Sequence, residues 1–232
     1  MDYKDKKCLI GVPSGSGFMP TMMVQSLLQL HKPLPCAFLT VERQRVDKAR
    51  NYFVQQALAG GFDYLMMIDD DNPIPPETLE KLLADDKDIV MATILSRNPD
   101  KNGKYNLCAF YAHSHKIDGK WLKLYDPIET FREEGDLHKI DGGGTGCILI
   151  KREVLEKLCK KHQGQVFEFG DIRFKNKIKI DGQEYDRRTM SEDCEFCERA
   201  INAGFEVWID ESICPLHITN YQVVQYKKAK NI

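Results

Sequence analysis

The sequence lacks any apolar run that approaches the roughly 20 residues needed to cross a bilayer. It also lacks a marked excess of one charge, because its charged residues, 29% of the chain, sum to a formal net charge of −2. This balance argues against nucleic acid or an anionic membrane as a partner held by overall charge. The N-terminus is charged and has no signal-peptide core, so we expect a cytoplasmic protein whose membrane association is at most peripheral.

The eight cysteines lack the arrangement of a structural zinc site. Residues 194–197 have the Cys-x-x-Cys spacing, but no second such pair completes a set of four ligands. On a helix these two cysteines share one face, so a pair of buried thiols explains the spacing equally well. Cys8, Cys36 and Cys147 lie in apolar runs, where a thiol packs as a small hydrophobic group. We therefore expect free thiols in a reducing compartment.

The first hundred residues alternate between strand and helix patterns. Short apolar runs predict the strands, and segments with apolar residues at helical spacing predict the helices between them. The expected strands are 8–12, 36–40, 63–68 and 89–93, and the expected helices are 21–30, 45–58 and one that begins near Pro75 and Pro76. The apolar face expected on the first of these helices consists of Met23, Val24, Leu27 and Leu28. This order predicts a parallel, Rossmann-like sheet with right-handed crossovers.

The second half of the chain is patterned differently. Short strand-like pieces and Asp-Gly turns such as 118–119 predict antiparallel ribbons between about 105 and 140. The charged stretch 164–190 has turn signals and no helical period, which predicts a mobile loop or hairpin. The other expected elements are a strand at 147–150, helices at 152–161 and 191–203, a strand at 205–209 and a surface helix in the tail, 221–230. The whole predicts an α/β fold: a mixed, mainly parallel sheet flanked by helices, with a small antiparallel addition.

Three carboxylates follow one of the predicted strands. Residues 64–72 read YLMMIDDDN, an unbroken apolar run that ends in Asp69, Asp70 and Asp71. These acids leave the sheet at the edge where open α/β folds bind ligands. Adjacent carboxylates repel one another, and Mg²⁺ or Mn²⁺ relieves that repulsion while leaving positions for a phosphate. The pattern indicates metal-assisted chemistry on a phosphate-bearing substrate, and a solvated acidic turn before a helix is the structural alternative.

Three further features are candidates for the same chemistry, each with a structural alternative. Glu192 and Asp193 follow a serine at a predicted helix N-terminus, where they cap the helix or where one of them serves as a base. His217 follows the last strand and is either an ordinary polar residue or a metal ligand. The glycines in 142–146 allow close approach of a ligand or form a flexible turn. They are not a Walker loop, because Gly-Lys-Ser/Thr is absent.

The order of these motifs is more specific than any one of them. The acidic motif at 69–72, the glycine-rich strand and helix at 144–158, the Ser-Glu-Asp helix and strand at 191–210 and a final histidine follow one another. In this order they resemble the GT-A glycosyltransferases, most of all the family 2-like group of bacteria and their phages. The resemblance covers about residues 7–218. It includes 46–51, which is similar to that group's Ala-Arg-Asn element before the acidic motif.

This resemblance implies a division of the chain and a set of ligands. A single domain over 1–232 would comprise a nucleotide-binding half at 7–100, an acceptor-binding half at 101–218 and a tail at 219–232. The implied donor is a nucleotide-diphosphate sugar, and the implied cofactor is Mn²⁺ or Mg²⁺. The implied acceptor is a hydroxyl of an unspecified glycan, lipid or protein. The stretch 164–190 would then be a lid or an acceptor loop.

The resemblance also implies roles for individual residues. Asp71 and His217 match metal ligands, and Asp69 matches the residue that faces the ribose or shares the metal through water. Asp70 takes part in either role. The acid that serves as base in inverting members is matched by Asp193, with Glu192 beside it. Pro13 and Ser14 match the loop that contacts the nucleoside. Arg50 matches a residue near the donor phosphates.

The resemblance, with which the residues agree, implies a metal-dependent, inverting transfer of a sugar to a hydroxyl, and two other interpretations stay open. A nucleotidyltransferase shares the general fold and the metal chemistry, but its basic glycine-rich loop is missing, because 13–18 holds neither Arg nor Lys. A catalytically inactive nucleotide-sugar-binding module would have the same fold without turnover, and the intact acids at 69–71, 192 and 193 argue against it. Fold alone does not decide between these functions.

Overall fold

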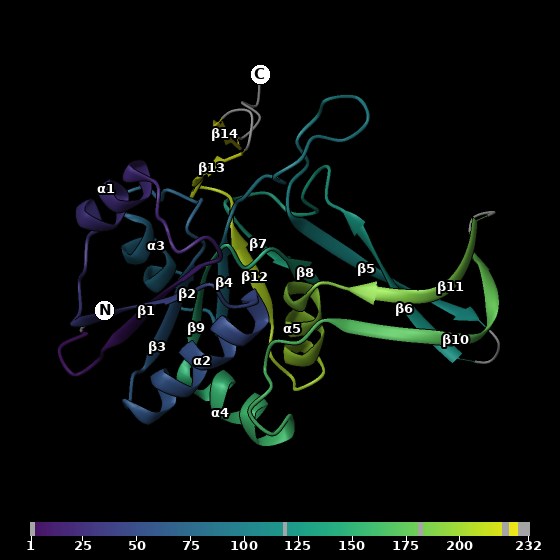
Figure 1. The fold of residues 1–232 in the computed structure, drawn as a ribbon, viewed down its shortest axis with the longest axis horizontal. Coiled ribbons are helices and arrows are strands. Elements are labelled where there is room, and N and C mark those ends of the chain that lie inside the picture. The colour runs from purple at the N-terminus through teal and green to yellow at the C-terminus, as the bar shows by residue number, and fades with distance from the viewer. Residues whose placement is uncertain (1–2, 118–119, 181–182, 220–222, 227–232) are drawn as a thin grey trace.

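A mixed sheet forms the centre of the protein (Figure 1). The computed structural model describes residues 3–117, 120–180, 183–219 and 223–226. Among these residues the strands of the central sheet are, in spatial order, β2 (Cys36–Glu42), β1 (Cys8–Ser14), β3 (Tyr64–Ile68), β9 (Cys147–Lys151), β4 (Ile89–Ala92), β12 (Val207–Asp210) and β7 (Leu137–Ile140). Strand β1 runs parallel to β2 and β3, and β4 runs parallel to β12. Strands β9 and β7 are antiparallel to their neighbours, so the sheet is mixed, as predicted.

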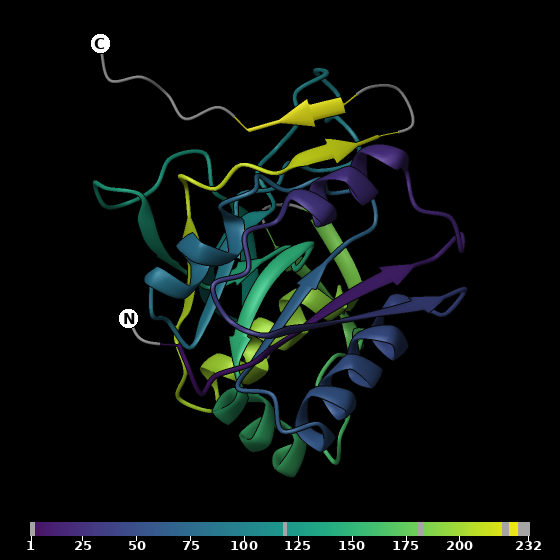
Figure 2. The same cartoon turned by 90° about the vertical axis from the view of Figure 1, so that its left-hand side faces the viewer.

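Helices cover both faces of this sheet (Figure 2). They are α1 (Thr21–Gln29), α2 (Val46–Ala59), α3 (Thr78–Ala84), α4 (Arg152–Lys161) and α5 (Glu192–Ile201). Alternate residues of a strand point to opposite faces. Leu65 and Met67 of β3 therefore join the apolar core beneath α2, α4 and α5. Met66 and Ile68 join the core beneath α1 and α3. This two-sided burial explains why β3 is an unbroken apolar run.

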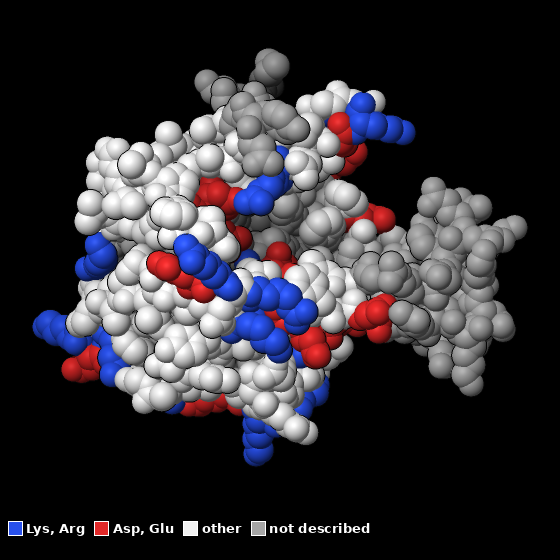
Figure 3. All heavy atoms as spheres, in the orientation of Figure 1, with Lys and Arg blue, Asp and Glu red and all other residues white. Residues whose placement is uncertain are grey.

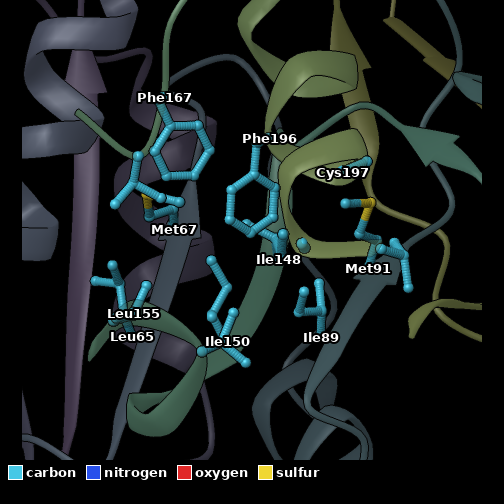
Figure 4. Packing of buried hydrophobic residues seen from close by; sticks show 14 of the residues in the cluster. Leu65, Met67, Ile89, Met91, Ile148, Ile150, Leu155, Phe167, Phe196 and Cys197 are labelled. Atoms are coloured by element: carbon cyan, nitrogen blue, oxygen red, sulfur yellow. The ribbon is translucent and has the colours of Figure 1, made fainter. Parts of the chain in front are cut away.

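The larger core is built around a pair of stacked rings (Figure 4). Phe167 and Phe196 are fully buried, and their ring centroids lie 4.5 Å apart with planes at 11°. The side chain of Asn51 fixes the backbone of Phe167, because its Nδ2 donates to the Phe167 carbonyl at 2.7 Å and its Oδ1 accepts from the Phe167 N–H at 2.9 Å. The segment before β10 is thereby held against α2 and α5, beside the acids of the α5 N-terminus.

Antiparallel ribbons form separate small sheets around the central sheet, mainly on the right of Figure 1. They comprise β5 (Ala109–Ile117), β6 (Lys120–Pro127) and β8 (Gly142–Gly143) in one small sheet, the hairpin of β10 (Gly170–Ile180) and β11 (Gln183–Met190), and the pair β13 (Leu216–Ile218) and β14 (Val223–Gln225). The predicted ribbons between 105 and 140 and the hairpin alternative for 164–190 are thus confirmed. The predicted Asp-Gly turn at 118–119 lies outside the described residues.

Two predictions about helices were wrong. In α1 the face that packs on the core contains Met23 and Ser26, whereas Val24 and Leu28 are 42% and 79% exposed. At 100° per residue, positions 24 and 28 lie more than a quarter turn from the buried face. In the tail, residues 223–225 form β14 and not part of a helix, because they pair with β13. Among the described residues, no helix is long and apolar enough to cross a membrane.

Candidate active site

The acids that follow β3 line a cavity of about 440 Å³ at the carboxyl ends of β1 and β3. Figure 3 shows a hollow near the centre of one face, in which acidic and basic atoms meet. The predicted site residues that line this cavity are Pro13, Arg50, Asp69, Asp70, Asp71, Glu192, Asp193 and His217. Ser14 is buried next to it and hydrogen-bonds to Asp70. The structure therefore brings together segments that are up to about 200 residues apart in the sequence.

Arg50 joins three of these acids at one end of the cavity. The residue is 1% exposed. Its Nη1 donates to Glu192 Oε1 at 2.6 Å and to Asp193 Oδ1, and its Nη2 donates to Asp69 Oδ1 at 3.0 Å. Helix α2 supplies the arginine, the end of β3 supplies Asp69, and the first turn of α5 supplies the other two acids. We expected Arg50 near the donor phosphates, but the structure encloses its guanidinium in carboxylates.

Arg50, Asp69, Glu192 and Asp193 form a charged group that we call the Arg50 cluster. Within it, burial and neighbouring charges shift the pKa values of Arg50, Asp69 and Glu192. Burial alone would lower the pKa of Arg50, but the charges of Asp193, Asp69 and Glu192 outweigh burial and raise it. Burial also raises the pKa of Asp69, although Arg50 opposes that shift. Burial and then the charge of Asp193 raise the pKa of Glu192 to about 7. Near neutral pH the cluster therefore holds a charged arginine and a proton that Glu192 binds and releases.

The Glu192→Gln variant should flatten the pH dependence of stability between about pH 4.5 and 7. The folded-state pKa of Glu192 lies above its ordinary value of 4.5, so the folded chain binds this proton more tightly than the unfolded chain. The stability due to Glu192 is thus fully present below about pH 4.5 and is lost as the pH rises through about 7. The difference between these two pKa values corresponds to roughly 3 kcal/mol in the free energy of unfolding. Urea unfolding of both proteins between about pH 5 and 8 measures the difference.

The comparison with the native protein cancels the contribution of Asp85 to the pH dependence of stability, which has the same sign as that of Glu192. Burial raises the pKa of Asp85 to about 7 as well, and Asp85 is present in both proteins. The free energy of unfolding of Glu192→Gln, minus that of the native protein, should therefore rise with pH. A difference that stays constant over this range would show that Glu192 has an ordinary pKa in the folded state.

Asp71 and His217 lie at the other end of the cavity. The backbone N–H groups of Leu216 and Ile218 donate to the carbonyls of Pro73 and Asp71 at 2.8 Å each, which holds β13 alongside the acidic motif. The Nδ1 atom of His217 lies 2.6 Å from the Leu95 carbonyl oxygen, and its Nε2 lies 3.5 Å from Asp71 Oδ2. Burial works against the charged imidazole, but the hydrogen bonds to Asp71 and the Leu95 carbonyl and the charge of Asp71 together outweigh burial and raise the pKa of His217.

This pair fits a divalent metal ion. A histidine whose Nδ1 is held by a backbone carbonyl presents its Nε2 in a fixed direction, which is the usual arrangement of a metal-binding histidine. The carboxylate oxygen of Asp71 faces that nitrogen. Within the described part of the chain, no three His, Cys, Asp or Glu side chains are grouped to hold a metal. An ion bound by Asp71 and His217 would therefore complete its coordination with ligand oxygens and water, as Mg²⁺ commonly does.

Two residues that the sequence did not single out take part in the site. Arg97 Nη2 donates to Asp71 Oδ2, the same oxygen that faces His217, and the Arg97 side chain is 55% exposed. Thr145 Oγ1 donates to Asp193 Oδ1. Thr145 lies inside the glycine-rich motif, so its position carried a signal, whereas Arg97 lies in a loop without one. Both hydrogen bonds fix the direction of a predicted catalytic or metal-binding carboxylate.

The glycine-rich motif also has a steric role at this site. A Cβ atom on Gly146 would lie 2.5 Å from Asn72 Oδ1 and 3.2 Å from Asp69 Oδ2. The Gly146 carbonyl accepts from the Asp69 N–H at 2.9 Å. Glycine is therefore needed at position 146, because the backbone there packs directly on the acidic motif. Gly144 and Gly146 also line the cavity, and the close approach of a ligand to this motif stays a prediction.

A sequence comparison decides the family. A model of glycosyl transferase family 2 matches residues 23–159, more than half of the chain. The chain belongs to glycosyl transferase family 2. The matched residues include the acidic motif, Arg50 and Thr145, and the predicted GT-A family and fold class are confirmed. No curated protein matches this family 2 chain in sequence.

One solved structure supports the fold, and a second is less similar. Protein A197 from STIV is 15% identical, with a TM-score of 0.53 over 96% of this chain and 95% of that one. UDP-glucose pyrophosphorylase complexed with UDP-glucose is 10% identical, with a TM-score of 0.44 over 95% of this chain and 92% of that one. At these identities the first likeness supports the fold of this family 2 protein alone, and the second is too low to support any conclusion.

Proposed function

We propose that this family 2 protein transfers a sugar from a nucleotide-diphosphate donor to an acceptor hydroxyl, with inversion and with Mn²⁺ or Mg²⁺ as cofactor. One observation carries the proposal. A single cavity holds a metal-compatible pair, Asp71 and His217, and a separate carboxylate, Asp193, that is fixed by two hydrogen bonds. Glycosyl transfer requires both parts, a site that stabilises the leaving diphosphate and a base for the acceptor.

The donor would bind across the acidic motif. Asp71 and His217 would hold the metal ion, which supplies positive charge to the leaving diphosphate. Arg97 is the arginine of this cavity with an exposed side chain, so we assign it to the diphosphate, a role that we expected for Arg50. We place the nucleoside against Pro13 and Ser14, with Asp69 and Asp70 near its ribose. These placements rest on the family and on the walls of the cavity.

Asp193 is the proposed base. The bonds from Arg50 and Thr145 both fall on its Oδ1, and no described residue binds its Oδ2. That oxygen would take the acceptor hydroxyl proton while the acceptor oxygen bonds to the anomeric carbon and the carbon–oxygen bond to the diphosphate breaks. Attack opposite the leaving group gives inversion. Glu192 is the less accessible of the two acids, with 8% of its side chain exposed against 23% for Asp193, so we assign it to tuning the Arg50 cluster.

Asp71→Ala should abolish metal-dependent donor binding. A ligand at 100 times its dissociation constant stabilises a protein by about 2.7 kcal/mol, which in a chain of this size raises the melting temperature by roughly 5–10 °C. We would measure melting curves with a panel of nucleotide diphosphates and nucleotide-sugars, each with and without Mn²⁺. The native protein should show a metal-dependent shift with one nucleotide, and the variant should show none.

Asp88→Ala is the matched control. Asp88 pairs with Lys151 at the opposite end of the sheet and lies outside the cavity, so its loss should leave the ligand shift intact. A shift that persists in Asp71→Ala would remove Asp71 from the metal site. A shift with nucleotide triphosphates and none with diphosphates would indicate a nucleotidyltransferase. No shift with any nucleotide would favour an inactive module.

A further inference from the structure

A second cavity, of about 770 Å³, lies beside the candidate active site. The two cavities share one wall, a short antiparallel ribbon in which Cys108 N–H donates to the Ile94 carbonyl and Ser96 N–H donates to the Asn106 carbonyl. Ile94 and Cys108 line the active-site cavity, and Leu95 and Leu107 line the second one. The remaining walls are the loops of 100–107 and 127–135, at the upper right of Figure 1.

The floor of this second cavity is a buried polar cluster that the proposed mechanism does not use. His138 is 2% exposed, and its ring stacks on Phe131 with centroids 3.9 Å apart and planes at 3°. Its Nε2 lies 3.3 Å from Glu211 Oε2, and the Tyr226 hydroxyl donates to Glu211 Oε1. The His138 Nδ1 atom is buried and has no hydrogen-bond partner among the described residues. A buried polar atom without a partner is costly unless something else binds it.

The rim of the second cavity is acidic. Among the residues that the structure describes, Lys104 is the single lysine or arginine that lines it, against four carboxylates at the rim, Asp100, Glu129, Glu133 and Glu134, and Glu211 in the floor. Within the described residues, Glu129, Glu133 and Glu134 form no ion pair, and all three are exposed. Unpaired carboxylates around a concave site make its potential negative, which repels phosphate and carboxylate groups.

We propose that this second cavity binds the acceptor, and that the acceptor is a saccharide without acidic groups. The proposal rests on the proposed function. Sugar rings offer a face of C–H groups, which packs on the negative face of an aromatic ring, and Phe131, Tyr105 and Tyr226 line the cavity. Sugar hydroxyls donate hydrogen bonds, and the carboxylates here are acceptors. The volume lies within the roughly 300–1,000 Å³ of typical ligand pockets.

The shared wall gives this second cavity a role in transfer. Two residues that line the active-site cavity are linked to this ribbon. Arg97 directly follows Ser96 of the ribbon, and His217 hydrogen-bonds to the Leu95 carbonyl. In this proposal the saccharide lies next to the donor, and a hydroxyl at one end of the saccharide is the one that reacts. Contacts remote from the reacting atoms then contribute binding energy that positions that hydroxyl.

The test is calorimetric binding of four probes to the full chain. The probes are maltotriose, which is neutral, a glucosamine trimer, which is cationic, a galacturonate trimer, which is anionic, and spermine, an amine without sugar rings. We expect at least one of the first two to bind, with affinity lowered about tenfold or more in Phe131→Ala. The galacturonate trimer and spermine should not bind. Phe38→Ala, which removes an exposed phenylalanine outside the cavity, should change nothing.

Two further measurements separate this proposal from its alternatives. The metal-dependent nucleotide shift should be unchanged in Phe131→Ala, which shows that the variant is folded and that its donor site is intact. The double variant Glu133→Lys, Glu134→Lys changes two exposed positions. It should bind the glucosamine trimer more weakly than the native protein does, and it should bind the galacturonate trimer. Equal binding of the anionic and neutral trimers, binding of spermine alone, or binding of none of the trimers would overturn the proposal, whatever the nucleotide shift shows.

Discussion

Asp193→Asn should lower kcat for sugar transfer about a thousandfold and leave donor affinity within a factor of about three. General-base catalysis contributes roughly 10²–10⁴ to a rate, and an amide cannot take the acceptor's proton. The fold should survive, because Arg50 keeps Glu192 and Asp69 as partners. Asparagine also retains an oxygen for the bonds from Arg50 and Thr145. Initial rates at saturating donor, together with the nucleotide melting shift, measure the two effects separately.

Two variants on the same helix sharpen this test. Glu195→Gln removes a carboxylate two residues after Asp193 on α5 that pairs with Arg199, outside the active-site cavity, and kcat should stay within a factor of about two. Glu192→Gln should lower kcat less than Asp193→Asn does. If Glu192→Gln lowers kcat more than Asp193→Asn does, the base is Glu192. The raised pKa of the Glu192 carboxyl would then suit it to accept the acceptor's proton.

Periodicity predicted most of the fold, because burial dictates it. The strand at 64–68 is apolar at every position since both of its faces are covered, and α4 begins and ends where predicted. The tail was different. Val223 and Val224 fit a helical or an extended pattern in isolation, and only pairing with β13 decides for the strand. The exposed Val24 and Leu28 of α1 have no signal in the sequence, because hydrophobicity alone does not say which side of a short helix is covered.

Short motifs predicted which residues meet at the candidate site, and the roles of these residues stay predictions. Asp71, Asp193 and His217 lie in the same cavity, as the resemblance implied. Their partners were harder to predict, since Arg97 and Thr145 meet them only through the tertiary fold. The family resemblance assigns a role to a residue, but it does not show which charged side chains lie next to that residue in the fold. The buried ion pairs of Arg50 are the main case, because nothing in the sequence around position 50 indicates three carboxylate partners.

Arg50→Met should destabilise the protein by about 3–5 kcal/mol at pH 8, the usual cost of leaving buried charges without a counter-ion. Methionine fills much of the same space, so the loss is mainly electrostatic. Asp69, Glu192 and Asp193 would then repel one another in the folded state, and the pKa values of Asp69 and Glu192 would rise above the native ones. Protonation relieves that repulsion, so the destabilisation should shrink as the pH falls from about 8 to 5. Urea unfolding of both proteins at the two pH values measures it.

The matched control lies two residues earlier on the same helix. Lys48→Met removes one positive charge from a side chain that is 55% exposed, and its effect should stay below about 0.5 kcal/mol at either pH. An Arg50→Met variant as stable as the native protein at pH 8 would mean that the three acids do not need the arginine as a counter-ion in the folded state. A loss that is large but independent of pH would mean that Arg50 acts through packing against Phe167, whose ring centroid is 5.9 Å from its guanidinium carbon. The pH dependence of the loss therefore decides whether α2, β3 and α5 are joined at the active site by charge.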